Sequence, residues 1–236
     1  MAKRPIFCPA NEGAQLVTTH LIDFKWHSGM AKSQAQKSIA ELHRSAATVL
    51  SLDEILEISS KSPLDLGVHL SAFNLMITTV KLRQTFSLEC AFQASKVFEH
   101  GGPFVDLLSA KSIDAKRDPR LRNSGKLIAF QFFGVSWKLL PRTAFYDWLY
   151  INALHKQPAL ADQVLSYRAF SDIAFNPDRS INCQAYAAAL YVSLHDRGLL
   201  TPRVLADRDS YLEVVTSFGA GNTRSEANQD DAFGGA

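Results

Sequence analysis

Residues 86–98 read Phe-Ser-Leu-Glu-Cys-Ala-Phe-Gln-Ala-Ser-Lys-Val-Phe, and this stretch says most about the fold and the site. A helix turns by about 100° per residue, so a helix over 86–99 places Glu89, Gln93 and Lys96 along one narrow stripe. Nearly all the other positions are apolar or small, whereas a solvated helix face carries more charge. The pattern therefore predicts a helix that is buried nearly all round and that presents an acid, an amide and an amine to a pocket.

The pair Glu89 and Lys96 has two interpretations. The first is structural: both are surface residues, or they form an ion pair with each other. The second is chemical, because burial raises the pKa of a carboxyl and lowers that of an amine, which yields a proton donor and a neutral nucleophile near pH 7. An ionised carboxylate beside an amine has the opposite effect on the amine, so the chemical interpretation requires burial to outweigh pairing.

The regions on either side of this stretch predict an α+β fold that is mainly α. Residues 16–26 are rich in β-branched and aromatic side chains and favour a strand, and residues 53–59 fit a short helix or a strand equally well. The remaining pattern is helical, and its last helix ends at Gly198, a natural left-handed terminator. The helices that we expect lie at 33–50, 141–156, 158–168 and 181–197.

We expect a single catalytic domain. It spans 51–216, and residues 1–50 form a small β-containing extension packed on it. Residues 217–236 are rich in Gly, Asn and Asp and have little to bury, so they predict a disordered tail.

The composition sets limits on class and location. The chain has 236 residues, of which 47% are hydrophobic and 20% charged, and this balance excludes a disordered, collagen-like or coiled-coil protein. A net charge of +2 does not mark a strong nucleic-acid binder, so such binding would need a local basic patch. No apolar run approaches the roughly 18–20 residues that cross a bilayer, and the amino terminus lacks a signal-peptide core. We therefore expect a cytoplasmic protein that does not bind membranes.

Cysteine and histidine spacing argues against a metal site. The three cysteines, Cys8, Cys90 and Cys183, are scattered and form no CxxC pair. The seven histidines form no HxxxH or HExxH spacing. We expect neither a metal nor another cofactor.

The octapeptide Glu-x-x-Phe-Gln-Ala-x-Lys at 89–96 resembles the signature of the NADAR superfamily, the YbiA-like proteins. Other elements of that family follow in order over 68–200. They are Leu-Ser-Ala-Phe-Asn at 70–74, Asp-Ala-Lys-Arg at 114–117, Trp137, Asp-Ile-Ala-Phe at 172–175, and Asn182 before a helix of small residues.

The whole chain is most similar to NADAR proteins encoded beside DarT-type toxins, on the stretches 58–62, 145–150 and 180–185. The sequence departs from the family in having Cys90 for a His, Phe175 for a Trp, and Thr-Phe at 85–86 for Trp-Pro.

This resemblance implies a NADAR-like fold and an enzyme. DarT-type toxins attach ADP-ribose to guanine in DNA, and the partner NADAR protein removes it. The implied activity is therefore an ADP-ribosyl hydrolase, an N-glycosidase that acts on ADP-ribosylated guanine in nucleic acid, releases ADP-ribose and serves as the antitoxin to such a toxin. The implied catalytic residues are Glu89, Lys96 and Asp172.

The implied substrate-binding residues share polar or aromatic side chains suited to a nucleotide. Arg117, in the basic segment 111–126, suits the pyrophosphate, although a solvated loop explains these charges equally well. Trp137 suits stacking on a base, although a lone Trp is more often part of the core. Asn182 is as easily a helix N-cap. The full set is Ser71, Phe73, Asn74, Gln93, Arg117, Trp137, Phe175 and Asn182.

Two mechanisms and two other functions stay open. In a dissociative route, Glu89 protonates the leaving nitrogen and water attacks an oxocarbenium ion, with Asp172 as the second carboxylate. In a covalent route, neutral Lys96 displaces the base amine and forms a Schiff base. The alternatives to the main function are an N-glycosidase for small phosphorylated ribosylamines of riboflavin metabolism, and a non-catalytic module that binds ADP-ribose or the toxin.

Overall fold

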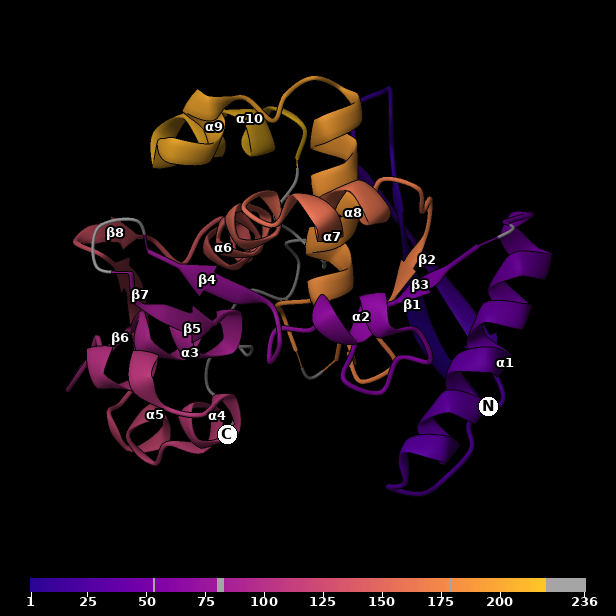
Figure 1. Ribbon diagram of the computed structural model, residues 1–236, viewed down its shortest axis with the longest axis horizontal. Coiled ribbons are helices and arrows are strands. Elements are labelled where there is room, and N and C mark those ends of the chain that lie inside the picture. Colours follow the sequence, from indigo (N-terminus) through magenta and orange to yellow (C-terminus); the bar gives the residue numbers. More distant parts are fainter. Residues whose placement is uncertain (53, 80–82, 179, 220–236) are drawn as a thin grey trace.

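The computed structural model describes residues 1–52, 54–79, 83–178 and 180–219. Helices make up 43% of it and strands 18%, in one domain. The α+β part of the expected fold class is therefore confirmed, whereas a mainly helical fold is not. In Figure 1, two parts of the molecule flank the central helix α8 (Gln184–Asp196), one built from residues 1–50 and the other from residues 83–137.

The first sheet contains residues from distant parts of the chain. Its strand order is β2-β1-β9-β3, with β1 (Ala2–Pro9) antiparallel to both β2 (Val17–Phe24) and β9 (Phe170–Ser171). Strand β3 (Leu56–Glu57) pairs with β9 in parallel. The expected strand at 16–26 is thus confirmed, and the ambiguous segment 53–59 contains a strand.

Helix α1 (Lys32–Leu50) covers this sheet, and it confirms the helix expected at 33–50. It buries Ile39, Leu42 and Ala46 against Ile6 and Phe24 of the sheet. The residues expected to form an N-terminal extension thus contribute β1 and β2 to one sheet with β3 and β9.

The centre of the molecule consists of α6 (Ala144–His155) and α8 (Gln184–Asp196), which pack against each other (Figure 1). Small buried side chains such as Ala185 and Ala188 let α8 approach its neighbours closely. Gly198 follows α8 with φ +65°, the left-handed conformation expected of a terminator.

The remaining elements surround this pair. They are α2 (Asp65–His69), the antiparallel pair β4 (Met76–Thr78) and β5 (Thr85–Ser87), a sheet of β6 (Lys96–Phe98), β7 (Leu127–Phe132) and β8 (Val135–Trp137), the 3-10 helix η1 (Val105–Ser109), α4 (Ser112–Arg117), α5 (Arg120–Asn123), α7 (Pro158–Val164), α9 (Pro202–Ala206) and α10 (Arg208–Ser217).

The single helix expected at 86–99 is wrong. Helix α3 covers only Leu88–Ala94, because a serine closes each end. The Ser87 hydroxyl accepts a hydrogen bond from the Cys90 backbone N–H (3.1 Å), and the Ser95 hydroxyl donates back to the Ala91 carbonyl (2.7 Å). Lys96 then begins β6, which pairs with β7.

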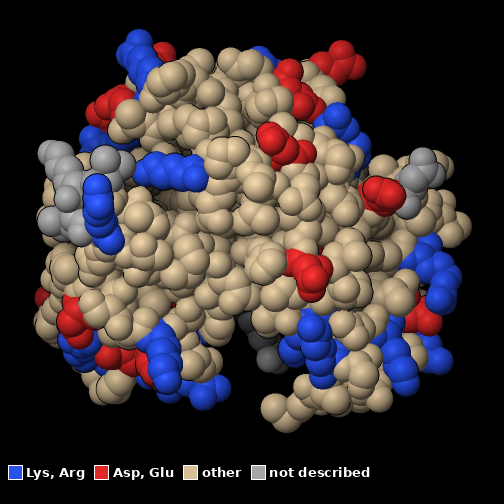
Figure 2. All heavy atoms as spheres, in the orientation of Figure 1, with Lys and Arg blue, Asp and Glu red and all other residues tan. Residues whose placement is uncertain are grey.

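The surface is hollowed between the part that carries α4 and α5 and the part that carries α1. In the view of Figure 2 this hollow opens at the lower edge, and Lys and Arg side chains stand on both of its sides. No helix in the described ranges is long and apolar enough to cross a membrane. Most of the expected tail, from residue 220, lies outside the described residues.

Gly67 in α2 packs against the chain at β3. A Cβ there would overlap the Glu57 carbonyl oxygen and the Ser62 side chain. We predict that Gly67→Ala lowers the free energy of unfolding by roughly 3 kcal/mol, because the obstacle is backbone that cannot move aside. Gly198→Ala is the matched control, since nothing lies within 4 Å of its Cβ position and only the strain of a positive φ, about 1 kcal/mol, applies. Urea denaturation measures both, and equal losses would contradict the packing argument.

Candidate active site

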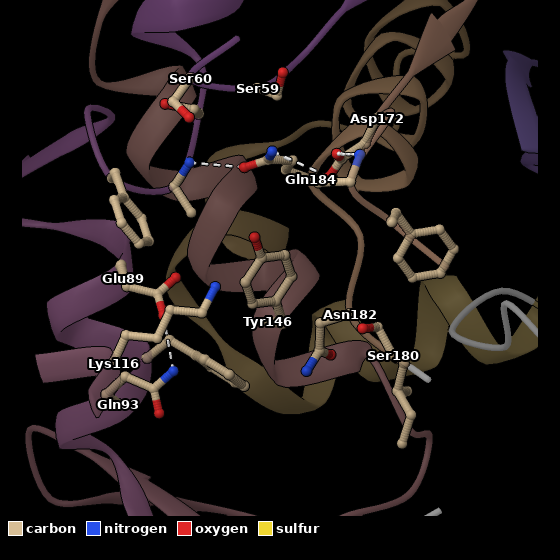
Figure 3. A pocket seen from close by; sticks show the side chains of 17 residues that line it. Ser59, Ser60, Glu89, Gln93, Lys116, Tyr146, Asp172, Ser180, Asn182 and Gln184 are labelled. Atoms are coloured by element: carbon tan, nitrogen blue, oxygen red, sulfur yellow. Dashed lines mark hydrogen bonds between the residues drawn. The ribbon is translucent and has the colours of Figure 1, made fainter. Parts of the chain in front are cut away.

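A polar cavity of about 420 Å³ lies between α3 and the segment that links β9 to α8 (Figure 3). This volume falls within the range of about 300–1,000 Å³ that small-molecule sites occupy. Its lining comes from separate parts of the chain, namely Ser59 and Ser60, Ser71 to Phe73, Glu89, Phe92 and Gln93, Lys116, Tyr146, Asp172, Ala174 and Phe175, and Ser180 to Asn182 with Gln184.

Helix α3 supplies one wall. Glu89 and Gln93 are one turn apart and both buried, and the Gln93 Nε2 donates to Glu89 Oε1 (2.9 Å). The Glu89 backbone N–H donates to the Ala72 carbonyl (2.9 Å), which fixes the start of the helix against the chain after α2. Gln93 Oε1 is buried without a hydrogen-bond partner among the described residues, so it is free to accept one from a ligand.

Asp172 lies on the opposite wall, directly after β9 (Figure 3). Its Oδ1 accepts from the Ala174 backbone N–H (3.0 Å) and its Oδ2 from the Gln184 Nε2 (3.1 Å). Burial raises the pKa of Asp172, although these hydrogen bonds stabilise its ionised form and oppose the rise. A carboxyl with a raised pKa in a cavity is suited to proton transfer.

The Gln184 amide connects the segments that line the cavity. Its Oε1 accepts from the Ala72 backbone N–H (2.8 Å), and its Nε2 donates both to the Ile58 carbonyl (2.6 Å) and to Asp172. One side chain at the start of α8 thereby joins the chain after β3, after α2 and after β9. Sequence reasoning missed it because nothing local marks a glutamine as a bridge.

Lys116 of α4 is the lysine on the cavity lining, and its Nζ lies 5.2 Å from the ring centroid of Phe73. The sequence analysis chose its neighbour Arg117, which is exposed at the end of α4 and does not line the cavity. Adjacent residues on a helix point about 100° apart, so Lys116 and Arg117 leave α4 in different directions. Lys116 belongs to the same Asp-Ala-Lys-Arg motif at 114–117, so the family resemblance already contained it.

Lys96 lies beside the cavity rather than on its lining. It stands on β6, and its Nζ is 4.9 Å from the ring centroid of Phe92. Burial lowers the pKa of Lys96 to about 8, and the charge of Glu89 opposes the shift. Lys96 therefore lies next to the cavity residues Glu89 and Phe92, and the effect of burial on its pKa outweighs that of pairing with Glu89.

The other expected binding residues divide into two groups. Ser71, Phe73, Phe175 and Asn182 line the cavity together with Gln93. Asn182 precedes the N-cap of α8, which is Cys183, so the N-cap interpretation of Asn182 is wrong.

Asn74 and Trp137 lie outside the cavity. The Asn74 amide is exposed and donates to the Val68 carbonyl and the Ser71 hydroxyl (both 3.0 Å). Trp137 is buried against the aromatic rings of Phe145 and Trp148, as expected for a core residue.

Tyr146 is a further cavity residue that the sequence did not reveal. It belongs to the stretch 145–150 that carried the family resemblance, but the pattern gave it no role. Across the described ranges, no group of three or more His, Cys, Asp and Glu side chains is arranged to hold a metal ion.

Most of the NADAR-type sequence elements contribute residues to this cavity, in which carboxyl groups stand on facing walls. The chain belongs to the NADAR class of proteins. More narrowly, residues 2–225 match the model of the family described as DarT1-associated NADAR antitoxin, and the chain is a member of this family. The resemblance inferred from the sequence is thus confirmed, together with a general antitoxin role. No curated protein matches the chain.

We predict that Gln184→Ala destabilises the protein by about 1–3 kcal/mol, because the buried Ala72 N–H and Ile58 carbonyl lose their partner. The control is Gln163→Ala on α7, whose exposed amide donates only to the Ala159 carbonyl and which should stay within about 0.5 kcal/mol of wild type. Chemical denaturation reports both values. A loss no larger than that of the control would mean that Gln184 does not hold the cavity together.

Proposed function

We propose that this protein is a hydrolase that removes ADP-ribose from guanine bases in DNA and thereby counters a DarT-type toxin. The observation that carries the proposal is the cavity in which Glu89 and Asp172 stand on facing walls. Enzymes that cleave glycosidic bonds usually place a carboxyl group on each side of the sugar.

The remaining lining residues suit the parts of an ADP-ribose. Lys116 supplies a positive charge for the pyrophosphate. The free Gln93 Oε1 accepts from a ribose hydroxyl or a base N–H, and the Asn182 amide is a second polar contact of this kind. Phe73 and Phe175 offer aromatic faces to a base or a sugar.

The reaction runs as a hydrolysis. Glu89 donates a proton to the exocyclic guanine nitrogen while the bond from that nitrogen to the anomeric carbon breaks. Water adds to the anomeric carbon of the resulting oxocarbenium ion, and Asp172 accepts the proton that this water loses. The products are free ADP-ribose and an unmodified guanine, and the proton taken up by Asp172 equals the one given by Glu89.

The position of Lys96 favours this route over a covalent one. A lysine nucleophile must reach the anomeric carbon, and Lys96 is not itself on the cavity lining, although it contacts the lining residue Phe92. Lys116 does line the cavity, yet its exposure keeps its amine in water and suits it to hold phosphate rather than to attack carbon.

The surface around the hollow supports a nucleic-acid substrate. Lys and Arg side chains flank both sides of the hollow in Figure 2. Such flanking charge attracts a phosphate backbone even though the net charge is only +2. Removal of the modification would protect the cell without direct contact with the toxin.

We predict that Glu89→Gln and Asp172→Asn each lower turnover by about 100-fold or more, because each removes one proton transfer. The assay incubates the protein with an oligonucleotide carrying ADP-ribosylated guanine and measures free ADP-ribose by chromatography. Exposed Glu213 and Asp162 provide the matched controls Glu213→Gln and Asp162→Asn, which should retain full activity. Wild-type protein that releases nothing from this oligonucleotide but cleaves a phosphorylated ribosylamine would refute the proposed substrate, and tight binding without cleavage would refute catalysis.

We also predict that borohydride added during turnover traps no adduct, and that Lys96→Arg keeps most of the wild-type rate. The reason is that no lysine forms a bond to the sugar in the dissociative route. Mass spectrometry of the treated protein checks this. An added mass on Lys96 or Lys116 would restore the covalent mechanism.

A further inference from the structure

Glu57 is a buried carboxyl that the proposed mechanism does not use. It ends the two-residue strand β3, is 1% exposed and does not line the cavity. A carboxyl buried this completely requires hydrogen-bond donors or a proton of its own, because a bare charge away from water is very unfavourable. The contacts of Glu57 show which groups supply these hydrogen-bond donors.

The residues on either side of Asp172 hold Glu57. The Ser171 hydroxyl donates to Glu57 Oε2 (2.5 Å), and the Ile173 backbone N–H donates to Glu57 Oε1 (2.9 Å). The parallel pairing of β3 with β9 sets Glu57 opposite Ser171. Gln184 strengthens the arrangement, because its Nε2 contacts both Asp172 and the Ile58 carbonyl next to Glu57. The two carboxyl groups are therefore fixed at the ends of neighbouring strands, Glu57 as the last residue of β3 and Asp172 directly after β9.

A histidine from α1 completes the chain of hydrogen bonds. His43 Nε2 lies 2.8 Å from the Ser171 Oγ, and burial lowers the pKa of His43 to about 4, so its ring is neutral at physiological pH. When Glu57 is ionised, Ser171 donates to it and His43 donates to Ser171. When Glu57 carries a proton, it donates to Ser171, the neutral His43 ring is the tautomer with its proton on Nδ1, and Ser171 donates to its bare Nε2. The chain thus satisfies Glu57 in both protonation states.

The charges that face this pair come from every neighbouring element. Arg4 on β1 bonds the Ile173 carbonyl (3.2 Å) and interacts with Asp172 and Asp178, while Lys116 stabilises the ionised form of Asp172. Neutral ionisable groups also surround Asp172, namely Tyr146 and Tyr150 on α6 and Cys183 before α8. Arg4 and Lys116 both act on Asp172, so Asp172 is the member of the pair that ionises first.

The same contacts explain the direction of both titrations. Burial raises the pKa of Glu57, and the charge of Asp172 raises it further, while hydrogen bonds to Ile173, Ser171 and Ser59 oppose the rise. Because Glu57 is bonded to the residues on both sides of Asp172, the charge of one carboxylate opposes ionisation of the other, and the two lose their protons in two separate steps.

We propose that Glu57 and Asp172 hold one proton between them at neutral pH, with Glu57 as a positioning residue that keeps this proton and leaves Asp172 ionised. The role of the ionised Asp172 as proton acceptor rests on the proposed hydrolase function, but the shared proton does not. Residues 1–50 then contribute to the site through His43.

The test of the shared proton needs no activity. Carboxyl carbon signals of wild type, Glu57→Gln and Asp172→Asn are followed by NMR from about pH 4 to 10. In wild type, the Asp172 signal should show two steps, and the Glu57 signal should titrate above pH 7. Glu57→Gln should reduce Asp172 to a single step, and Asp172→Asn should lower the pKa of Glu57.

An ionised Glu57 at pH 7, or an Asp172 titration that Glu57→Gln leaves unchanged, overturns the proposal. If Glu57→Gln does not fold, the wild type and Asp172→Asn decide the outcome, because the fall in the Glu57 pKa depends only on them.

The catalytic consequence is read from the pH dependence of kcat/KM. Above its second ionisation the wild-type pair carries two negative charges, which oppose binding of a pyrophosphate, whereas the amide introduced by Glu57→Gln stays neutral. We compare the kcat/KM of each protein at pH 9 with its own value at pH 7. This ratio should be ~3-fold or more larger for Glu57→Gln than for wild type. Parallel profiles overturn the positioning role. A wild type without any activity refutes the proposed function instead and leaves the NMR result to stand alone.

Discussion

The pairing of the two-residue strand β9 with strands on both sides is the contact on which the site depends. Phe170 and Ser171 bond to β1 on one edge and to β3 on the other, and both residues are fully buried. Their backbone groups have no access to water, so both neighbours must stay in place to satisfy them. Asp172 follows immediately, and its position in the cavity is as rigid as this short strand.

The cavity is polar although it borders an apolar core, and the fold offsets this unfavourable burial with hydrogen bonds. Glu89 is bonded to Gln93, and Asp172 to Gln184 and the Ala174 N–H. These partners are neutral amides, which orient a carboxyl without fixing its charge. The choice of amide partners therefore agrees with acid–base chemistry.

Local patterns in the sequence predicted what depends on local structure. The strand at 16–26, the helix at 33–50 and the termination at Gly198 are confirmed because periodicity and glycine preference determine them within a few residues. The pair Glu89 and Gln93 also falls as expected, since four residues fit within the short α3.

What depends on distant segments could not be predicted. Lys96 needed the helix to continue past Ser95, but pairing with β7, more than thirty residues away by the register Lys96↔Phe130, turned it into a strand. The choice between Lys116 and Arg117 depended on which face of α4 meets the cavity. Glu57 has no local signal, because its partners Ser171 and Ile173 are 114 and 116 residues away.

The position of β1 has a consequence for how the chain is made. The β1–β2 hairpin can form soon after synthesis begins, yet the inner edge of β1 has no partner until β9 emerges much later. During that time Ile6 and Phe7 present an open, apolar strand edge, which is a template for mispairing with other chains. A chain that ends before residue 170 therefore keeps this strand edge unpaired and is prone to aggregate, so the last third of the sequence protects the first strand.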